Sequence, residues 1–110
     1  MTAVTRRIAI AAVLALGTVQ ASSQEAPSAA ALRARSLAAT CAACHGTDGR
    51  APAGAALPGL AGTPAPVLAE QLKAFKSGAR AGTVMPQLAK GYSDTQIEQL
   101  AAWFSKASPP

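Results

Sequence analysis

The sequence predicts an all-α fold of three to four helices, and three observations support this. Apolar side chains recur at helical spacing in the second half of the chain, and no stretch shows the alternation of apolar and polar residues that marks a strand. A Ser or Thr stands where each helix would begin. The third observation is the pentapeptide C-A-A-C-H of residues 41–45, which contains both cysteines and the single histidine of the chain. The fold is therefore expected to be organised around this pentapeptide.

The pattern C-x-x-C-H is the attachment signature of c-type haem. Two thiols, here Cys41 and Cys44, form thioethers with the two vinyl groups on one edge of the porphyrin, and the imidazole of His45 then reaches the iron. The small residues Ala42 and Ala43 let the backbone lie against the ring. The motif therefore predicts one covalently attached haem c per chain.

Two other interpretations of the motif compete with haem attachment. A redox-active C-x-x-C normally follows a strand in a βαβ unit, and no strand pattern precedes residue 41. A structural zinc site needs four ligands, whereas the chain offers three Cys or His side chains within five residues. Haem attachment agrees best with the rest of the sequence.

The N-terminus predicts a cleaved secretory signal peptide over residues 1–23. Arg6 and Arg7 precede an apolar run at 8–16, and small residues follow at 21–23. The run is shorter than the roughly 18 residues of a membrane span, so an uncleaved anchor is the weaker alternative. Bacteria attach c-type haem outside the cytoplasmic membrane, so we expect a periplasmic protein with no membrane span after cleavage.

Residues 24–28 are expected to be a short linker, and residues 29–108 one small domain. Loss of Arg6 and Arg7 would lower the formal charge from +5 to about +3, and no run of Lys and Arg with interleaved aromatics is present, which argues against nucleic-acid binding. Half of the residues are hydrophobic, but most of these are Ala. A haem would supply the large apolar body that so small a domain lacks.

The first helix is expected over residues 29–40 with Ser28 as its N-cap, running directly into the haem motif so that the cysteines lie on its last turn. The stretch at 51–64, rich in Ala, Gly and Pro, is expected to be an ordered loop over the haem edge. There the carbonyl of Pro58 would accept a hydrogen bond from the other ring nitrogen of the ligating His, and Leu60 would pack on the ring.

Two further helices follow. Thr63 is expected to cap a helix that has Pro64 as its first residue, ends at Gly78 and has one apolar face, made of Leu68, Leu72 and Phe75. The last helix is expected over residues 94–106, with a capping box of Ser93 and Gln96. Its apolar face consists of Ile97, Leu100, Ala101 and Phe104, and we expect it to cross the first helix near Ala34 and Leu37.

Met85 is the remaining methionine once Met1 leaves with the signal peptide. It is expected in a non-helical loop that Pro86 stiffens, and its thioether is a soft ligand suited to the second axial position of iron. Arg80 could pair with a haem propionate, because guanidinium binds carboxylate in a bidentate way. A core-filling role for Met85 and a solvated Arg80 are the alternatives.

Taken together, residues 34–105 resemble a bacterial class I cytochrome c of the small monohaem type. The resemblance is carried by LAATCAACHGTDGR, LPGLAGTPAPVLAEQLKAFKSGAR and TVMPQLAKGYSDTQIEQLAAWF. It implies the class I cytochrome c fold, with N- and C-terminal helices crossing. It also implies haem attachment at Cys41 and Cys44, axial ligation by His45 and Met85, and support of the histidine by Pro58. Ala34 is a departure, because relatives often carry Gly at the helix crossing.

The resemblance implies a periplasmic one-electron carrier rather than an enzyme. The segment AKGYSDTQIEQLAAWF, preceded by TVMP, is similar to the cytochrome subunit of flavocytochrome c sulfide dehydrogenase, which accepts electrons from a flavin subunit. The expected partners are redox proteins, among them a flavoprotein dehydrogenase and a terminal oxidase or another cytochrome. The alternatives are a dedicated subunit of such a dehydrogenase, and a haem gas sensor or peroxidase-like enzyme with an open iron site.

Overall fold

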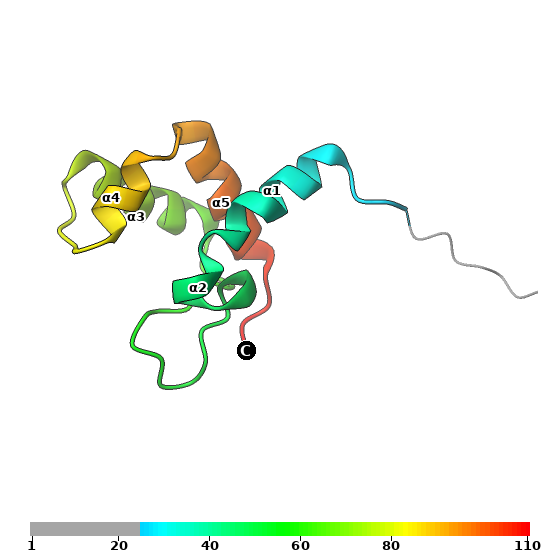
Figure 1. Ribbon diagram of the computed structural model, residues 1–110, viewed down its shortest axis with the longest axis horizontal. Coiled ribbons are helices and arrows are strands. Elements are labelled where there is room, and N and C mark those ends of the chain that lie inside the picture. The colour runs from blue at the N-terminus through cyan, green and yellow to red at the C-terminus, as the bar shows by residue number, and fades with distance from the viewer. Residues whose placement is uncertain (1–24) are drawn as a thin grey trace, which may run out of the picture.

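The computed structural model describes residues 25–110, and within that range the chain is helical without strands, as the sequence predicts (Figure 1). It contains five α-helices and one short 3-10 helix: α1 (Ala29–Ala39), α2 (Ala42–His45), η1 (Thr47–Gly49), α3 (Ala65–Ser77), α4 (Met85–Lys90) and α5 (Asp94–Lys106). The signal peptide predicted over residues 1–23 lies outside the described residues. Among residues 25–110, no helix has the length and apolar character needed to cross a membrane.

The first helix does not run into the haem motif, which corrects the sequence prediction. Ser28 caps α1 as predicted, its Oγ accepting from the amide of Ala31 at 3.2 Å. The helix then ends at Ala39, because the amides of Thr40 and Cys41 bond to carbonyls three residues back, and this tighter turn leaves the helix axis. Cys41 therefore caps the separate one-turn helix α2, and Cys44 lies within it.

Met85 begins a helix instead of lying in a loop, which is the second correction. The amides of Gln87 and Leu88 bond to the carbonyl of Val84, at 3.0 and 3.2 Å, and this starts α4. Pro86 is the second residue of α4, where its missing N–H costs no hydrogen bond. The proline that the sequence assigns to stiffening a loop thus fits the first turn of a helix.

The start of α3 differs by one residue from the prediction. Pro64, in an extended conformation with ψ of 135°, is the N-cap in place of Thr63, and its carbonyl accepts from the amides of Val67 and Leu68. Gly78 ends the helix in the left-handed conformation with φ of 86°, as the sequence predicts.

Helix α5 forms the centre of the core and has the predicted bounds. Ser93 and Gln96 make both hydrogen bonds of the capping box, at 3.1 and 2.8 Å. Helix α5 packs between α1 and α3, so the N- and C-terminal helices meet as predicted (Figure 1). The buried residue of α1 is Ala38, whereas Ala34 stays partly exposed. The core consists of Ala38, Leu68, Ala69, Ile97, Leu100, Ala101 and Phe104.

Two ion pairs connect α3 with α5 across the surface. The ammonium of Lys73 pairs with Glu98, and that of Lys76 pairs with Asp94 at 2.7 Å. The hydrogen bond from Lys76, with its positive charge, holds the pKa of Asp94 below its ordinary value of 3.8.

Gly49 ends η1, the short turn that follows the C-x-x-C-H motif, and it is tightly packed. It is buried with φ of +74°, and a Cβ there would lie 2.9 Å from the Ala61 amide, the Leu60 Cβ and a Phe104 ring carbon. We expect Gly49→Ala to lower the free energy of unfolding by about 2–4 kcal/mol, from left-handed strain plus overpacking. Gly54→Ala is the matched control, because φ is +78° but nothing lies within 4 Å, and it should cost only about 1 kcal/mol. Equal losses in urea unfolding of the two variants would contradict this account.

Asp94 gives the fold a pH-dependent contribution to stability. Because the folded-state pKa of Asp94 is lowered, its carboxylate stabilises the fold at pH values above the ordinary pKa of 3.8. This contribution disappears as the pH falls through the folded-state pKa. Asp94→Asn should therefore lower the melting temperature near neutral pH, and the difference from wild type should vanish at about pH 2. Glu70→Gln, at an exposed carboxylate without an ion pair among the described residues, should show no such trend.

Candidate functional site

A cavity of about 440 Å³ lies among the helices, and every residue that the sequence predicts as functional lines it. Its walls come from the junction of α1 and α2, from the loop before α3, and from α3, α4 and α5. The predicted residues that it brings together are Cys41, Cys44, His45, Pro58, Leu60, Arg80 and Met85.

The two thiols lie on one turn of chain at α2. Cys41 is half-buried, Cys44 is exposed, and both are free cysteines. Burial raises the pKa of the Cys41 thiol, the Thr40 hydroxyl lowers it in part, and the neighbouring Cys44 raises it further. Both sulfurs are thus available at one edge of the cavity, three residues apart.

The imidazole of His45 is held by the loop before α3. Its Nδ1 lies 2.7 Å from the carbonyl oxygen of Pro58, which is the contact expected from the sequence. Because a carbonyl only accepts hydrogen bonds, Nδ1 carries the proton, and the lone pair of Nε2 is left for a metal. The loop is itself fixed, since the amides of Leu60 and Ala61 both bond to the carbonyl of Gly49, at 2.8 and 3.1 Å.

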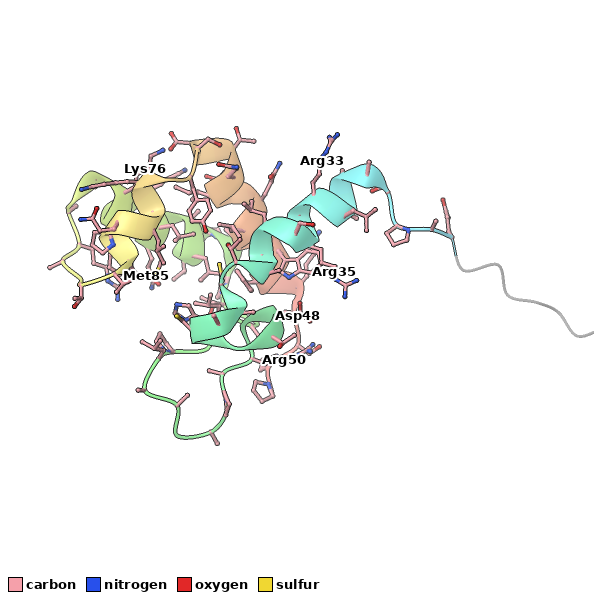
Figure 2. The ribbon with its side chains drawn as sticks, viewed as in Figure 1. Arg33, Arg35, Asp48, Arg50, Lys76 and Met85 are labelled. Carbon is pink, nitrogen blue, oxygen red and sulfur yellow. The ribbon has the colours of Figure 1, made fainter. Side chains whose placement is uncertain are left out.

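The opposite side of the cavity is formed by α3, α4 and the connection between them. Met85 lies half-buried at the start of α4 (Figure 2). The guanidinium of Arg80 lies over the ring of Phe75, 4.7 Å from its centroid. Arg80 is also the one Lys, Arg, Asp or Glu among the lining residues, so the described part of the cavity has a single charged group, which is positive.

These residues fit a haem. The lining is mostly apolar, with Leu as its commonest residue, which suits the apolar faces of a porphyrin, and it includes two thiols for attachment, an imidazole nitrogen and a thioether. Nitrogen and thioether donors suit iron, and a guanidinium suits a carboxylate group at the edge of the ring.

Two residues of the cavity wall were missed in the sequence. The hydroxyls of Thr40 and Tyr92 lie 2.9 Å apart, although 52 residues separate them in the chain. Neither belongs to the C-x-x-C-H motif or to an apolar stripe, so no local pattern could have identified the pair.

Residues 28–104 match the family model described as cytochrome C oxidase, cbb3-type, subunit III. The chain is 46% identical over 72 residues to the thiosulfate dehydrogenase electron acceptor of Thiomonas intermedia, covering 66% of this chain and 33% of that protein. It is 42% identical over 69 residues to cytochrome c-554(548) of Halomonas halodenitrificans, covering 60% and 82%.

A third relative, the cytochrome subunit of sulfide dehydrogenase of Chlorobaculum tepidum, is 37% identical over 76 residues, covering 69% of this chain and 67% of that protein. The chain thus spans about a third of the length of the Thiomonas relative and two thirds or more of the other two.

Proposed function

Because the chain belongs to this cytochrome c family and is an electron-transfer protein with covalently bound haem c, we propose that His45 and Met85 hold the iron of a periplasmic one-electron carrier. The observation that supports this proposal is a cavity that brings the motif residues, the free Nε2 of His45 and the thioether of Met85 together.

The site residues that the sequence predicts then each have a defined task. Haem c supplies the iron that takes up and releases one electron. The thioethers of Cys41 and Cys44 fix the group to the chain. Pro58 holds the His45 ring in the tautomer that ligates, at the 2.7 Å contact. His45 and Met85 would both hold the iron in either oxidation state, so electron transfer would need little structural reorganisation.

The remaining lining residues tune and shield the site. Leu60 packs against the core at the base of the loop and would contact the ring. Arg80 would pair with a propionate, held in place by its contact with Phe75. The apolar walls lower the local dielectric and, with thioether ligation, favour the reduced state.

The N-terminal sequence completes this proposal. Residues 1–23 serve as a cleaved signal peptide, residues 24–28 as a linker and residues 29–108 as the cytochrome c domain. Export delivers the chain to the compartment in which covalent haem is attached, and the carrier works there as a periplasmic protein.

The partner is proposed to be a dehydrogenase of reduced sulfur compounds. Two relatives are named for such enzymes, one as the electron acceptor of thiosulfate dehydrogenase and one as the cytochrome subunit of sulfide dehydrogenase. The second name supports the alternative that the chain is a dedicated subunit of a flavoprotein dehydrogenase. Gel filtration of the purified holoprotein with candidate dehydrogenases separates the two: a carrier elutes alone, and a subunit elutes in a stable complex.

Met85→Ala tests directly whether Met85 would hold the iron. The wild-type holoprotein should show a low-spin c-type spectrum with a weak long-wavelength sulfur-to-iron band, and Met85→Ala should lose this band and bind carbon monoxide readily in the ferrous state. The reduction potential should also fall, by a sizeable part of the roughly 0.8 V over which the ligands of the iron change the reduction potential of haem.

Leu88→Ala is the matched control for Met85→Ala. Leu88 belongs to the same helix and lines the same cavity but has no donor atom, so the band should persist. A wild-type spectrum that is high-spin and unchanged by Met85→Ala would exclude the proposed ligation, and an open-site sensor or peroxidase-like enzyme would then be favoured.

The attachment chemistry is tested at the cysteines. Cys41→Ser and Cys44→Ser should each leave a single thioether, and the double variant should lose haem completely under denaturing electrophoresis followed by a haem stain. Ser105→Ala, which removes a hydroxyl on α5 that does not line the cavity, should retain the full stain. Full haem retention by the double variant would contradict covalent attachment at this motif.

A further inference from the structure

We propose that Tyr92 and Thr40 form a hydrogen-bonded latch that positions α4, and with it Met85, against the haem. The inference rests on the proposed function, because it assumes that Met85 ligates the iron. Neither residue would touch the iron; both act as positioning residues by joining two walls of the cavity that they line.

The direction of the hydrogen bonds follows from the groups involved. The hydroxyl of Thr40 donates to the carbonyl of Leu37 at 2.7 Å, which uses its single proton. The phenol of Tyr92, 2.9 Å away, therefore donates to Thr40 Oγ1. The result is a chain of donors that runs from Tyr92 through Thr40 into the last turn of α1.

Thr40 is tied to the wall that holds the attachment cysteines. It caps the end of α1, and the next residue is Cys41, whose sulfur lies 3.9 Å from the same hydroxyl. A group that bonds to Thr40 is therefore fixed relative to the thioether edge of the haem.

Tyr92 is tied to the wall that holds Met85. Its amide bonds to the carbonyl of Ala89 at 3.2 Å, and Ala89 is completely buried within α4. At the other end of this helix, Val84 is 57% exposed and residues 79–84 all lie at the surface. The firm anchorage of α4 is therefore at its C-terminal end, next to Tyr92.

The latch is a specific link between these walls. Among the side-chain hydrogen bonds of residues 25–110, the Tyr92–Thr40 bond is the one that joins the α1–α2 junction to the α4–α5 junction. Helix α4 also packs against α3, but α3 does not carry the attachment cysteines. Without the latch, α4 keeps its packing on α3 and loses its direct tie to the other wall.

The expected consequence is a weaker hold of Met85 on the iron. A net hydrogen bond corresponds to a factor of about 2 to 10 in an equilibrium constant. Tyr92→Phe should therefore raise the apparent affinity of the ferric holoprotein for imidazole, which displaces Met85, by about 2- to 10-fold. The displacement is followed by the loss of the sulfur-to-iron band as imidazole is added. A general loss of stability that leaves the protein folded would not change the imidazole affinity measured in this way.

Three further variants separate positioning from other effects. Thr40→Val should raise the imidazole affinity as Tyr92→Phe does, Thr40→Ser should restore it towards wild type, and the Tyr92→Phe/Thr40→Val double variant should add little to either single change, since both remove one interaction. Ser77→Ala is the control, because it removes two side-chain hydrogen bonds at the end of α3, to the carbonyl of Ala74 and from the amide of Ala79, and Ser77 does not line this cavity.

The outcomes distinguish failure of the latch from failure of the proposed function. If wild type shows the band, Met85→Ala loses it, and Tyr92→Phe leaves the imidazole affinity unchanged while lowering the melting temperature, the pair is structural only and the latch is refuted. Additive effects of Tyr92→Phe and Thr40→Val would refute it as well. If the wild-type holoprotein lacks the band, the proposed ligation itself is wrong.

Discussion

The hydrogen bond between His45 Nδ1 and the carbonyl of Pro58 is the interaction on which the site depends. It fixes the ring nitrogen that faces the cavity, and it does so only while the loop before α3 keeps its place. That place is set by the carbonyl of Gly49, which accepts two amides of the loop, while Gly46, with φ of +80°, lets the turn after His45 close, because a Cβ there would lie 2.2 Å from the carbonyl oxygen of Arg50. Two glycines thus allow the close backbone approach that orients the imidazole.

The apolar cavity explains how an Ala-rich chain of this size can form a stable domain. Ile97 and Leu100 are the largest fully buried side chains among the described residues, so the protein core is small. The cavity beside it is lined by further apolar groups, including Leu60, Leu68 and Phe104, which belong to the core cluster or pack against it. A haem in this cavity extends the core rather than occupying a separate site, so folding and attachment are expected to support each other.

The sequence predicted what is determined locally and missed what depends on distant contacts. The capping box of Ser93 and Gln96 is encoded within four residues, and α5 has the predicted bounds. No Gly or Pro marks the break in the helix after Ala39. Thr40 is held in its turn by a tertiary hydrogen bond to Tyr92 as well as by local hydrogen bonds, and the tertiary one cannot be read from the neighbouring sequence. The helical start at Met85 was also hidden, since a proline after the residue fits a loop and a first helical turn equally well.

The distribution of charge bears on how such a carrier would meet its partners. On the α3–α5 face the cations are matched, Lys73 by Glu98 and Lys76 by Asp94. At the cavity, by contrast, Leu57, Val84 and Leu88 are between 45% and 57% exposed, and Arg80 is the one charged lining residue among those described. Under the proposed function, a partner that docks at the mouth of the cavity would contact these apolar side chains more than charged ones. A limited apolar contact area gives weak complexes that dissociate quickly, which suits a protein that must release one partner before it reduces the next.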